Sequence, residues 1–308
     1  MSVARASGSG RNRVGHTAPA KVNLYLHVTG RRADGYHLLD SLVVFTDVGE
    51  RIDAAPASQL SLTLKGPRAG DLDRGVENLV LRAARMLAAA SQVRRGADIT
   101  LHKTMPVASG IGGGSTDAAA ALHILRALWD VDHDGAIAGR LAPQLGADVP
   151  VCLAGVPSLV GGIGEILKPA PPLPPAFVVL ANPGVPLSTR DVFAALGGKC
   201  GDGNPLSSPP PDARSLALAL GERRNDLEAP ALRLAPEIAH VLAALNGAAN
   251  CLLARMSGSG ATCFGLFAEE GQARAAAGAI GAARPAWWVR WAALQHAPPA
   301  LETTLPPY

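Results

Sequence analysis

Apolar and polar residues alternate with two different periods along the chain, which predict separate strands and helices. Strand-like alternation over residues 17–29 is followed by a polar turn and by a second predicted strand over 38–48. Helical spacing of apolar residues begins near Asn78 and continues to Ala90. The other elements predicted in the first half are strands over 60–65 and 99–102, helices over 118–125 and 135–145, and a strand that residues 148–153 lead into.

The second half mixes strands and helices in the same way after a proline-rich connector. Residues 169–175 are rich in proline, which cannot continue a helix, so we place a domain boundary there. Beyond it the sequence predicts strands over 177–181 and 287–294, a strand, glycine turn and strand over 255–267, helices over 191–196, 226–234, 236–245 and 270–280, and a Gly/Ser/Pro loop over 197–211. We therefore expect an α+β fold with a disordered tail (1–16) and two domains (17–168 and 169–308).

A glycine-rich segment between a predicted strand and a predicted helix carries the clearest chemical signal. This glycine loop, residues 105–117, has the sequence Met-Pro-Val-Ala-Ser-Gly-Ile-Gly-Gly-Gly-Ser-Thr-Asp. Glycine tolerates positive φ and has no Cβ, so consecutive backbone N–H groups can converge on one anion. Ser115, Thr116 and Asp117 can cap the following helix, whose N-terminus adds positive potential. The segment predicts a phosphate-binding loop.

Two common phosphate-binding loops do not fit this spacing. A Walker loop places Lys-Ser or Lys-Thr after its last glycine, whereas Gly114 is followed by Ser115-Thr116. A dinucleotide fingerprint has the spacing G-x-G-x-x-G, whereas Gly110, Gly112 and Gly113 give G-x-G-G. A flexible Gly/Ser turn is the alternative, but a linker needs no uninterrupted helix directly behind it.

Composition limits the class of protein. The chain has 308 residues, of which 48% are hydrophobic and 17% charged, as is typical of globular domains with real cores. Its net charge of +3 gives no reason to expect nucleic acid or a membrane surface as a partner, and no apolar run approaches the ~20 residues of a membrane span. The four cysteines show no C-x-x-C pairing, so we expect buried free thiols in a cytoplasmic protein.

Several motifs in a fixed order resemble those of the GHMP small-molecule kinases. They are Pro19-Ala-Lys-Val-Asn-Leu24, Arg31-Arg-Ala-Asp-Gly-Tyr-His37, the glycine loop, Leu145-Gly-Ala-Asp-Val-Pro150 and Met256-Ser-Gly-Ser-Gly-Ala261. The resemblance covers roughly residues 17–295. It implies a two-domain fold, with an N-terminal ribosomal-protein-S5-like nucleotide-binding domain and a C-terminal ferredoxin-like domain.

The resemblance also implies a reaction, the transfer of phosphate from ATP to an alcohol with Mg²⁺ as cofactor. Asp34-Gly-Tyr-His37 and Gly146-Ala-Asp-Val-Pro150 resemble the branch that phosphorylates the 2-hydroxyl of a cytidine-diphospho sugar alcohol in non-mevalonate isoprenoid synthesis. A kinase for homoserine, mevalonate or a sugar is the nearest alternative, and a nucleotide-binding scaffold without catalysis is another. We expect no partner besides these small molecules, and a monomer or a weak homodimer.

Lys21 and Asp148 are the expected catalytic pair. Lys21 interrupts an otherwise apolar strand, where a charge is out of place unless it faces a site; the alternative is a lysine that reaches solvent at a sheet edge. Asp148 follows Gly146 at a predicted helix-to-strand junction, and by the resemblance it accepts the proton of the acceptor hydroxyl. The alternative is a loop aspartate bound to its own backbone. Beside Asp148, the Lys21 ammonium would keep the carboxylate charged.

By the same resemblance, ATP is bound by the glycine loop, with Asn78 and Lys103 on the base and ribose side. The loop residues are Pro106, Val107, Ala108, Ser109, Gly110, Ile111, Gly112, Gly113, Gly114, Ser115 and Thr116. Ser115 or Thr116 is the expected protein oxygen near Mg²⁺, although phosphates and water can hold the ion by themselves. Ser257-Gly-Ser-Gly260, the second glycine turn, is expected to pack against the loop.

Acceptor recognition is expected at Tyr36 and His37, because an exposed aromatic ring and an imidazole can stack on a pyrimidine and bond its polar edge. The resemblance adds Phe193 on the other face of the cytosine, and Ile163 and Thr189 in the pocket lining. Asn23 shares the strand face of Lys21 and can bond the substrate. Taken alone, a residue such as Phe193 is more often part of a core than a ligand contact.

Overall fold

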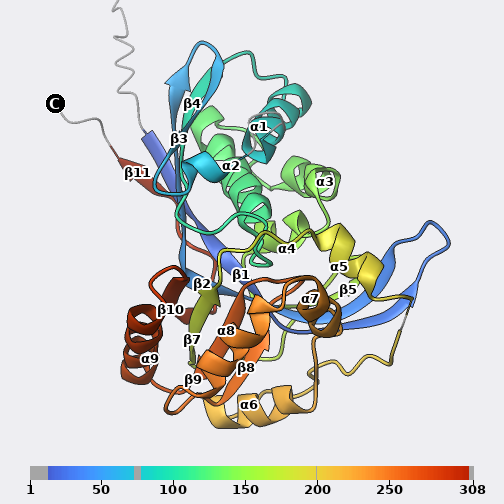
Figure 1. The fold of residues 1–308 in the computed structure, drawn as a ribbon. Coiled ribbons are helices and arrows are strands. Elements are labelled where there is room, and N and C mark those ends of the chain that lie inside the picture. Colours follow the sequence, from blue (N-terminus) through green and yellow to red (C-terminus); the bar gives the residue numbers. More distant parts are fainter. Residues whose placement is uncertain (1–12, 73–77, 199, 305–308) are drawn as a thin grey trace, which may run out of the picture.

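A computed structural model describes residues 13–72, 78–198 and 200–304 (Figure 1). Its strands are β1 (Arg13–Arg31), β2 (His37–Ala57), β3 (Leu60–Lys65), β4 (Gly96–His102), β5 (Ser158–Gly162), β6 (Ile166–Pro169), β7 (Phe177–Asn182), β8 (Leu253–Met256), β9 (Cys263–Phe267), β10 (Trp288–Gln295) and β11 (Glu302–Thr304). Its α-helices are α1 (Leu79–Ala90), α2 (Gly113–Trp129), α3 (Ala136–Leu145), α4 (Val149–Ala154), α5 (Thr189–Ala195), α6 (Ala213–Gly221), α7 (Glu228–Leu234), α8 (Glu237–Asn246) and α9 (Glu270–Ala283).

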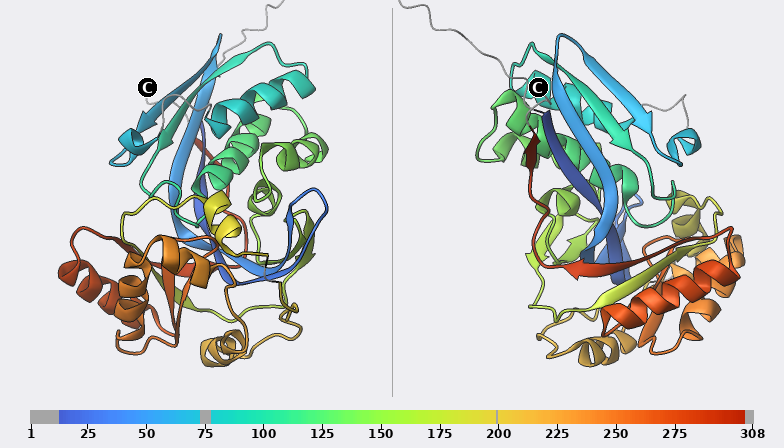
Figure 2. Two further views of the ribbon diagram at one scale, coloured as in Figure 1. Left: turned by 45° about the vertical axis from the view of Figure 1, so that its right-hand side comes forward. Right: turned by 90° about the vertical axis from the view of Figure 1, so that its left-hand side faces the viewer.

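One sheet runs through both halves of the described chain, in the order β11-β1-β2-β10-β7-β9-β8, and β3 to β6 join it beside β2. Strand β2 is long enough to pair with β5 at residues 39–43, with β10 at 45–46 and with β4 at 51–57. Every pairing of named strands is antiparallel except that of β3 with β4. The two views of Figure 2 show β1 and β2 running from the end that carries α1–α3 toward the C-terminal helices.

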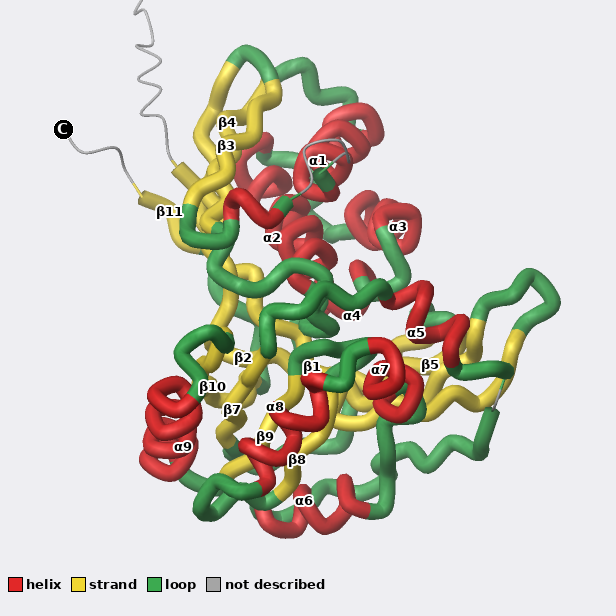
Figure 3. The backbone as a smooth tube through the Cα atoms, viewed as in Figure 1, coloured by secondary structure: helices red, strands yellow, loops and turns green. Residues whose placement is uncertain are grey.

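Separate cores bury the two ends of this sheet. Helices α1 and α2 pack on this end of the sheet and α3 packs on both helices; the core they form includes Ile52, Leu87 and Leu122. Helices α8 and α9 cover β7 and β9, with Val241 and Phe267 in the core between them. Figure 3 shows α1–α3 gathered at one end of the molecule and α6, α8 and α9 at the other. The glycine loop and α5 are thereby held near the middle.

Most of the predicted elements are confirmed within one to three residues, but two of them are wrong where they bear on the site. Residues 149–154 form helix α4, with Pro150 in its first turn, so Asp148 stands before a helix and not at the predicted helix-to-strand junction. The strand that residues 148–153 lead into is β5, which begins only at Ser158. Helix α2 begins at Gly113, within the glycine loop, and Gly112 precedes it in the left-handed region. Ser115, Thr116 and Asp117 therefore lie inside α2 and are not caps.

The short strands β6 and β11 were not predicted, because their patterns are too brief to stand out, and helix α6 was also not predicted. Residues 13–16 of the expected tail belong to β1, and residues 1–12 lie outside the described residues. The proline-rich connector follows β6, which ends at Pro169, and leads into β7. Beyond Gln295 the chain returns to the first half, where β11 pairs with β1.

The loop over 197–211 packs against β1 and β2, with the exception of residue 199, which lies outside the described residues. Gly201 N–H donates to the Val28 carbonyl at 2.9 Å, and Asn204 N–H donates to Asp40 Oδ2 at 2.7 Å. Cys200, on this loop, is exposed, which corrects the expectation that all four thiols are buried; Cys152 and Cys263 are buried and all four are free. No helix in the described part of the chain is both long and apolar enough to cross a membrane.

Candidate active site

A cleft of about 1280 Å³ lies where the two halves meet, and it is lined by residues of both. Its walls come from β1, the glycine loop, the start of α2, the residues before α4, the turn between β1 and β2, and α5. Ligand pockets are usually about 300–1,000 Å³ in volume. This cleft therefore has room for a nucleotide together with a second small molecule.

The glycine loop forms one wall of the cleft in a conformation that only glycine adopts easily. Gly110 and Gly112 have φ angles of 76° and 70°. A Cβ on Gly110 would lie 2.5 Å from the Ser257 carbonyl oxygen, and one on Gly112 would lie 3.1 Å from Cβ of Lys21. The loop can approach its neighbours this closely only because these positions carry no side chain.

The second glycine turn packs against the loop as predicted. Ser257 Oγ donates to the Gly110 carbonyl at 3.1 Å, and Thr262 N–H donates to the Ser109 carbonyl at 3.0 Å. Ser257 Oγ also accepts from Asn23 N–H at 3.1 Å, which ties the turn to β1. These bonds fix the loop between the two halves of the chain.

Lys21 and Asp148 meet beside the glycine loop. Lys21 Nζ lies 2.7 Å from Asp148 Oδ2, and the Lys21 side chain is 5% exposed while that of Asp148 is 47% exposed. The register of β1 with β2 shifts between Pro19 and Lys21, and such a bulge redirects the following side chain. Lys21 N–H donates to the Ile111 carbonyl at 3.0 Å, which joins this bulge to the loop.

Asp148 occupies the N-cap position of α4, but its side chain makes no capping hydrogen bond. The carboxylate instead lines the cleft, with Oδ2 on Lys21; among the described residues, no donor reaches Oδ1. The pair thus presents one anchored and one available carboxylate oxygen beside the phosphate loop. This arrangement is what a general base beside a phosphoryl donor requires.

Asn23 lines the same wall. Its Nδ2 donates to Ser41 Oγ at 2.8 Å, whereas Oδ1 is buried without a hydrogen-bond partner among the described residues. A buried amide oxygen without a donor is costly, and Asn23 carries this cost in the lining of the cleft.

The predicted acceptor residues gather at the other end of the cleft, although their rings are arranged differently from the prediction. His37 and Phe193 stack directly, with ring centroids 5.0 Å apart and planes at 25°, whereas Tyr36 is 59% exposed. Since a base between two rings needs about 3.5 Å on each side, none fits between His37 and Phe193 as they lie. Burial, with the charge of Arg31, lowers the pKa of His37, so the ring is neutral at neutral pH.

Ile163 and Thr189 also line the cleft, as predicted. The Thr189 hydroxyl lies 2.8 Å from Ser259 Oγ, which attaches the start of α5 to the second glycine turn. The structure therefore brings together most of the predicted side chains: Lys21, Asn23, Tyr36, His37, Ala108, Ser109, Gly110, Gly112, Gly113, Gly114, Ser115, Asp148, Ile163, Thr189 and Phe193.

The remaining predicted residues do not line the cleft in this structure. Asn78 caps α1, accepting from Val80 N–H at 2.9 Å. Lys103 is buried, because its ammonium pairs with Glu50 and, at 3.0 Å, with Asp117. The hydroxyl of Thr116 donates back to the carbonyls at the start of α2. Pro106 and Ile111 are buried, and Val107 is partly buried.

Family models place the chain among known proteins. The model of the GHMP kinases N terminal domain matches residues 78–156, and that of the GHMP kinases C terminal region matches residues 211–286. A 4-diphosphocytidyl-2-C-methyl-D-erythritol kinase of Paramagnetospirillum magneticum is 58% identical over 272 residues, which cover 88% of this chain and 95% of that protein. The chain belongs to the 4-diphosphocytidyl-2-C-methyl-D-erythritol kinase family.

The 4-diphosphocytidyl-2-C-methyl-D-erythritol kinase of Parvibaculum lavamentivorans is 50% identical to this chain, and the match covers 90% of this chain and 96% of that protein. A crystal structure of 4-(cytidine 5'-diphospho)-2C-methyl-D-erythritol kinase is 38% identical with a TM-score of 0.74, covering 91% of this chain and 98% of the other. A homoserine kinase of Cytophaga hutchinsonii shares the fold, with a TM-score of 0.71 at 17% identity over 98% of this chain and 100% of its own. The mixed α+β architecture is thus that of the GHMP kinases.

A kinase of this family uses ATP, and the described residues fit Mg²⁺ held largely by the nucleotide. Within residues 13–72, 78–198 and 200–304, no group of three or more His, Cys, Asp or Glu side chains could hold a metal ion. Ser115 lines the cleft, whereas the hydroxyl of Thr116 is already bonded to backbone carbonyls. Phosphate oxygens and water are the usual ligands where a protein offers so few.

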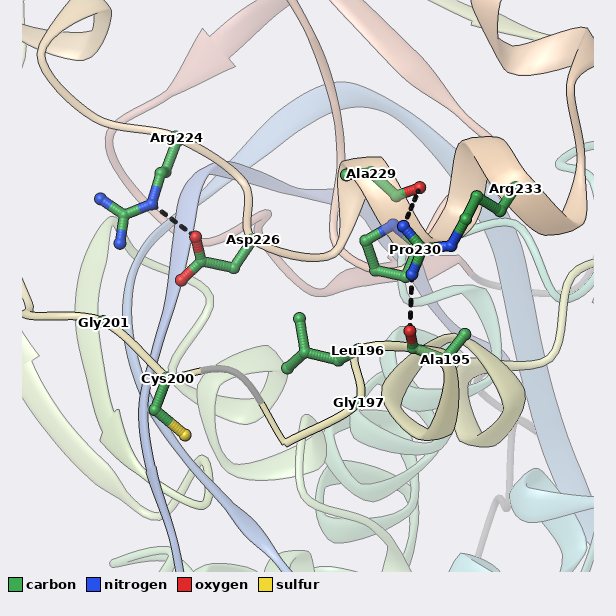
Figure 4. Close-up of a pocket in the computed structure, with 10 residues that line it drawn as sticks. All are labelled: Ala195, Leu196, Gly197, Cys200, Gly201, Arg224, Asp226, Ala229, Pro230 and Arg233. Atoms are coloured by element: carbon green, nitrogen blue, oxygen red, sulfur yellow. Dashed lines mark hydrogen bonds and ion pairs between the residues drawn. The ribbon is translucent and has the colours of Figure 1, made fainter.

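Sequence reasoning missed Arg31 and Arg190 in the lining of the cleft, and Glu50 beneath it. Arg190 directly follows the predicted Thr189, and this neighbouring position is the signal in the sequence that could have identified it as a lining residue. A second cavity, of about 480 Å³, lies between the C-terminal end of α5 and α7 (Figure 4). There Arg233 donates to the Ala195 carbonyl and Arg224 donates to Asp226. The second cavity holds none of the residues predicted for this kinase family.

Proposed function

We propose that the chain transfers the γ-phosphoryl group of ATP to the 2-hydroxyl of 4-diphosphocytidyl-2-C-methyl-D-erythritol, a step of non-mevalonate isoprenoid synthesis. The observation that carries the proposal is the meeting of Lys21 and Asp148, 127 positions apart, beside the glycine loop. A binding protein needs the loop but neither charge. The pair therefore supports catalysis over a scaffold role.

The ATP phosphates lie along residues 106–116, where backbone N–H groups and the start of α2 supply positive potential. Bound Mg²⁺ would neutralise charge that develops on the phosphate oxygens, and Ser115 is the side chain that would reach it. A Cβ placed on Gly114 would lie 3.5 Å from Cδ1 of Leu79. Leu79 also lines the cleft, where it contributes an apolar surface on the side of the ATP base.

The acceptor lies across the cleft, with its cytosine at Tyr36, His37 and Phe193 and its methylerythritol at Asn23, Lys21 and Asp148. Ile163 and Thr189 complete the lining between these ends. Because His37 now covers Phe193, binding of the base requires one of these rings to turn. Tyr36 is exposed and is free to stack on the base from outside.

In the reaction, the 2-hydroxyl oxygen attacks the γ-phosphorus, the bond from that phosphorus to the β,γ-bridging oxygen breaks, and ADP leaves with the electron pair. The hydroxyl proton passes to Asp148, at the oxygen that Lys21 does not hold. Lys21 fixes the carboxylate and places a positive charge next to the alkoxide character that develops. Positioning by the two glycine segments supplies the in-line geometry.

The experiment is ADP release by the purified chain with ATP, Mg²⁺ and one acceptor at a time. The acceptors are 4-diphosphocytidyl-2-C-methyl-D-erythritol, homoserine, mevalonate and galactose. The proposal predicts kcat/KM at least about a thousandfold higher for the cytidine compound, because only that acceptor meets both ends of the cleft. Preference for another acceptor would refute it, and ATP binding without ADP release from any acceptor would support the scaffold alternative.

A further inference from the structure

The proposed acceptor carries a diphosphate between its two recognised ends, and the preceding assignments leave that group without a partner. We propose that Arg190 binds this diphosphate and makes the cleft selective for a nucleoside diphosphate over a nucleoside. The inference rests on the proposed function and deepens it. It concerns a residue that neither the glycine segments nor the Lys21–Asp148 pair involves.

The charged groups of the cleft single out Arg190. The cationic side chains in its lining are Lys21, Arg31 and Arg190. Lys21 is nearly buried and paired with Asp148. The Nε of Arg31 donates to the Gly35 carbonyl at 3.2 Å, so this side chain braces the β1–β2 turn.

The carboxylates of the lining are also engaged elsewhere. Asp34 lies 2.7 Å from Arg32, and Asp148 holds Lys21. Arg190 is exposed, and within the described ranges of the chain no ion pair or side-chain hydrogen bond ties its guanidinium down. Arg31 is also exposed and has no ion pair among the described residues, but its Nε is held by the Gly35 carbonyl, whereas the Arg190 guanidinium is accessible and has neither an ion pair nor a side-chain hydrogen bond there.

The position of Arg190 on α5 puts it next to the base-binding end. Arg190 and Phe193 are three residues apart, so they are neighbours on one face of the helix. Phe193 stacks on His37, and Thr189 is bonded to the second glycine turn. Helix α5 is therefore held at both of these contacts, and Arg190, which lies between Thr189 and Phe193 in the helix, lines the cleft.

Guanidinium suits the ligand, because its planar donors can bond two oxygens of a phosphate at once. Homoserine and mevalonate have no phosphate for this contact. The same contact costs little when the cleft is empty, since the side chain stays in water. Arg190 is thus a specificity-determining residue and takes no part in the transfer itself.

The test measures binding of CDP and of cytidine by calorimetry, with the ATP site saturated by a non-hydrolysable ATP analogue. The proteins are the wild-type chain, Arg190→Ala, Arg190→Lys and the control Arg140→Ala, an exposed arginine of α3 far from the cleft lining. Steady-state kinetics with ATP and 4-diphosphocytidyl-2-C-methyl-D-erythritol accompany the titrations.

Loss of a charge-assisted contact predicts CDP binding about ten- to a hundredfold weaker in Arg190→Ala, with cytidine binding unchanged. KM for the acceptor rises by the same factor while KM for ATP stays constant. For Arg190→Lys, the CDP affinity and the acceptor KM lie between those of the wild type and of Arg190→Ala. For Arg140→Ala, both match the wild type.

Suppose that the wild type phosphorylates the acceptor, but that Arg190→Ala changes the affinities for CDP and cytidine equally, or changes neither. That result would overturn the role of Arg190 and leave the proposed function intact. A wild type that neither binds CDP nor phosphorylates the acceptor would instead remove the proposed function, and this inference with it.

Discussion

Lys21 shows what a single residue reveals in a sequence. A lysine between buried apolar neighbours must find a counter-charge or a ligand, so the strand alone predicts a site. Lys103, which the family resemblance put beside the nucleotide, is also a buried lysine, but its ammonium is satisfied by Glu50 and Asp117. Burial requires a partner but does not say which one, and partners distant in the chain are visible only after folding.

Replacement of Lys21 by methionine should lower kcat about a hundredfold or more, because the charge beside the reacting oxygen is lost while the packing volume is kept. ATP affinity should change little, since the phosphates rest on the glycine loop. Steady-state ADP release and calorimetry with ATP measure the two effects. The matched control is Lys168→Met, an exposed lysine of β6. If both variants lose the same activity, Lys21 has no special place in the transfer step.

At the scale of elements, the periodicity of apolar residues predicts the strands and helices that build the walls of the cleft. It does not predict at which residue the elements at the site begin or end. Helix α2 starts at Gly113 and not at the Ser-Thr-Asp cap, because Gly110 and Gly112 supply the left-handed turn that begins it. Asp148 precedes a helix and not a strand. Short apolar runs such as 149–153 fit either structure, and tertiary contacts decide between them.

Gly110→Ala tests the fit between the two glycine segments. Its Cβ would lie 2.5 Å from the Ser257 carbonyl oxygen, at a φ of 76°, so the loop must shift. We expect a loss of about 1–3 kcal/mol in the free energy of unfolding and at least about tenfold weaker ATP binding. Gly139→Ala in α3, where a Cβ meets nothing within 4 Å, should be neutral or stabilising. Similar behaviour of the two variants in urea unfolding and ATP titration would contradict this account.

A pair of stacked histidines gives the first half a defined pH dependence. His16 on β1 and His123 on α2 stack with centroids 5.2 Å apart, and His123 Nε2 donates to the Leu153 carbonyl. Burial lowers the pKa of both rings, that of His123 to about 4, with the neighbouring His16 adding to the effect. The His123 ring is therefore largely neutral in the folded chain above its pKa of about 4, whereas in the unfolded chain it binds a proton below about pH 6.5.

Stability should consequently fall as the pH drops from 6.5 toward 4, because protons favour the unfolded state. For His123 alone we expect a loss of about 1–2 kcal/mol between pH 7.5 and pH 5. Urea unfolding of the wild type and of His123→Phe at both pH values isolates this share, since the carboxylates titrate alike in both proteins. An equally steep pH dependence in the variant would contradict it.

At the scale of the molecule, the site exists because segments far apart in the chain share one sheet. Asn225 Nδ2 donates to the carbonyls of Met256 and Gly258, both at 2.8 Å, and so holds the second glycine turn under the loop. Ser257 then reaches Gly110, 147 positions away. The motifs named these segments, but their contacts depend on β2 carrying partners from both halves, which no local pattern encodes.

The central claim is that Asp148 takes the proton of the acceptor hydroxyl and plays no part in holding ATP. The most direct test is the Asp148→Asn variant, measured in one sample for kcat with 4-diphosphocytidyl-2-C-methyl-D-erythritol and for ATP affinity. We predict kcat lower by about a factor of 10² to 10⁴, with the ATP dissociation constant unchanged within about twofold. A variant that keeps wild-type kcat, or that loses activity only because it no longer binds ATP, would contradict the account.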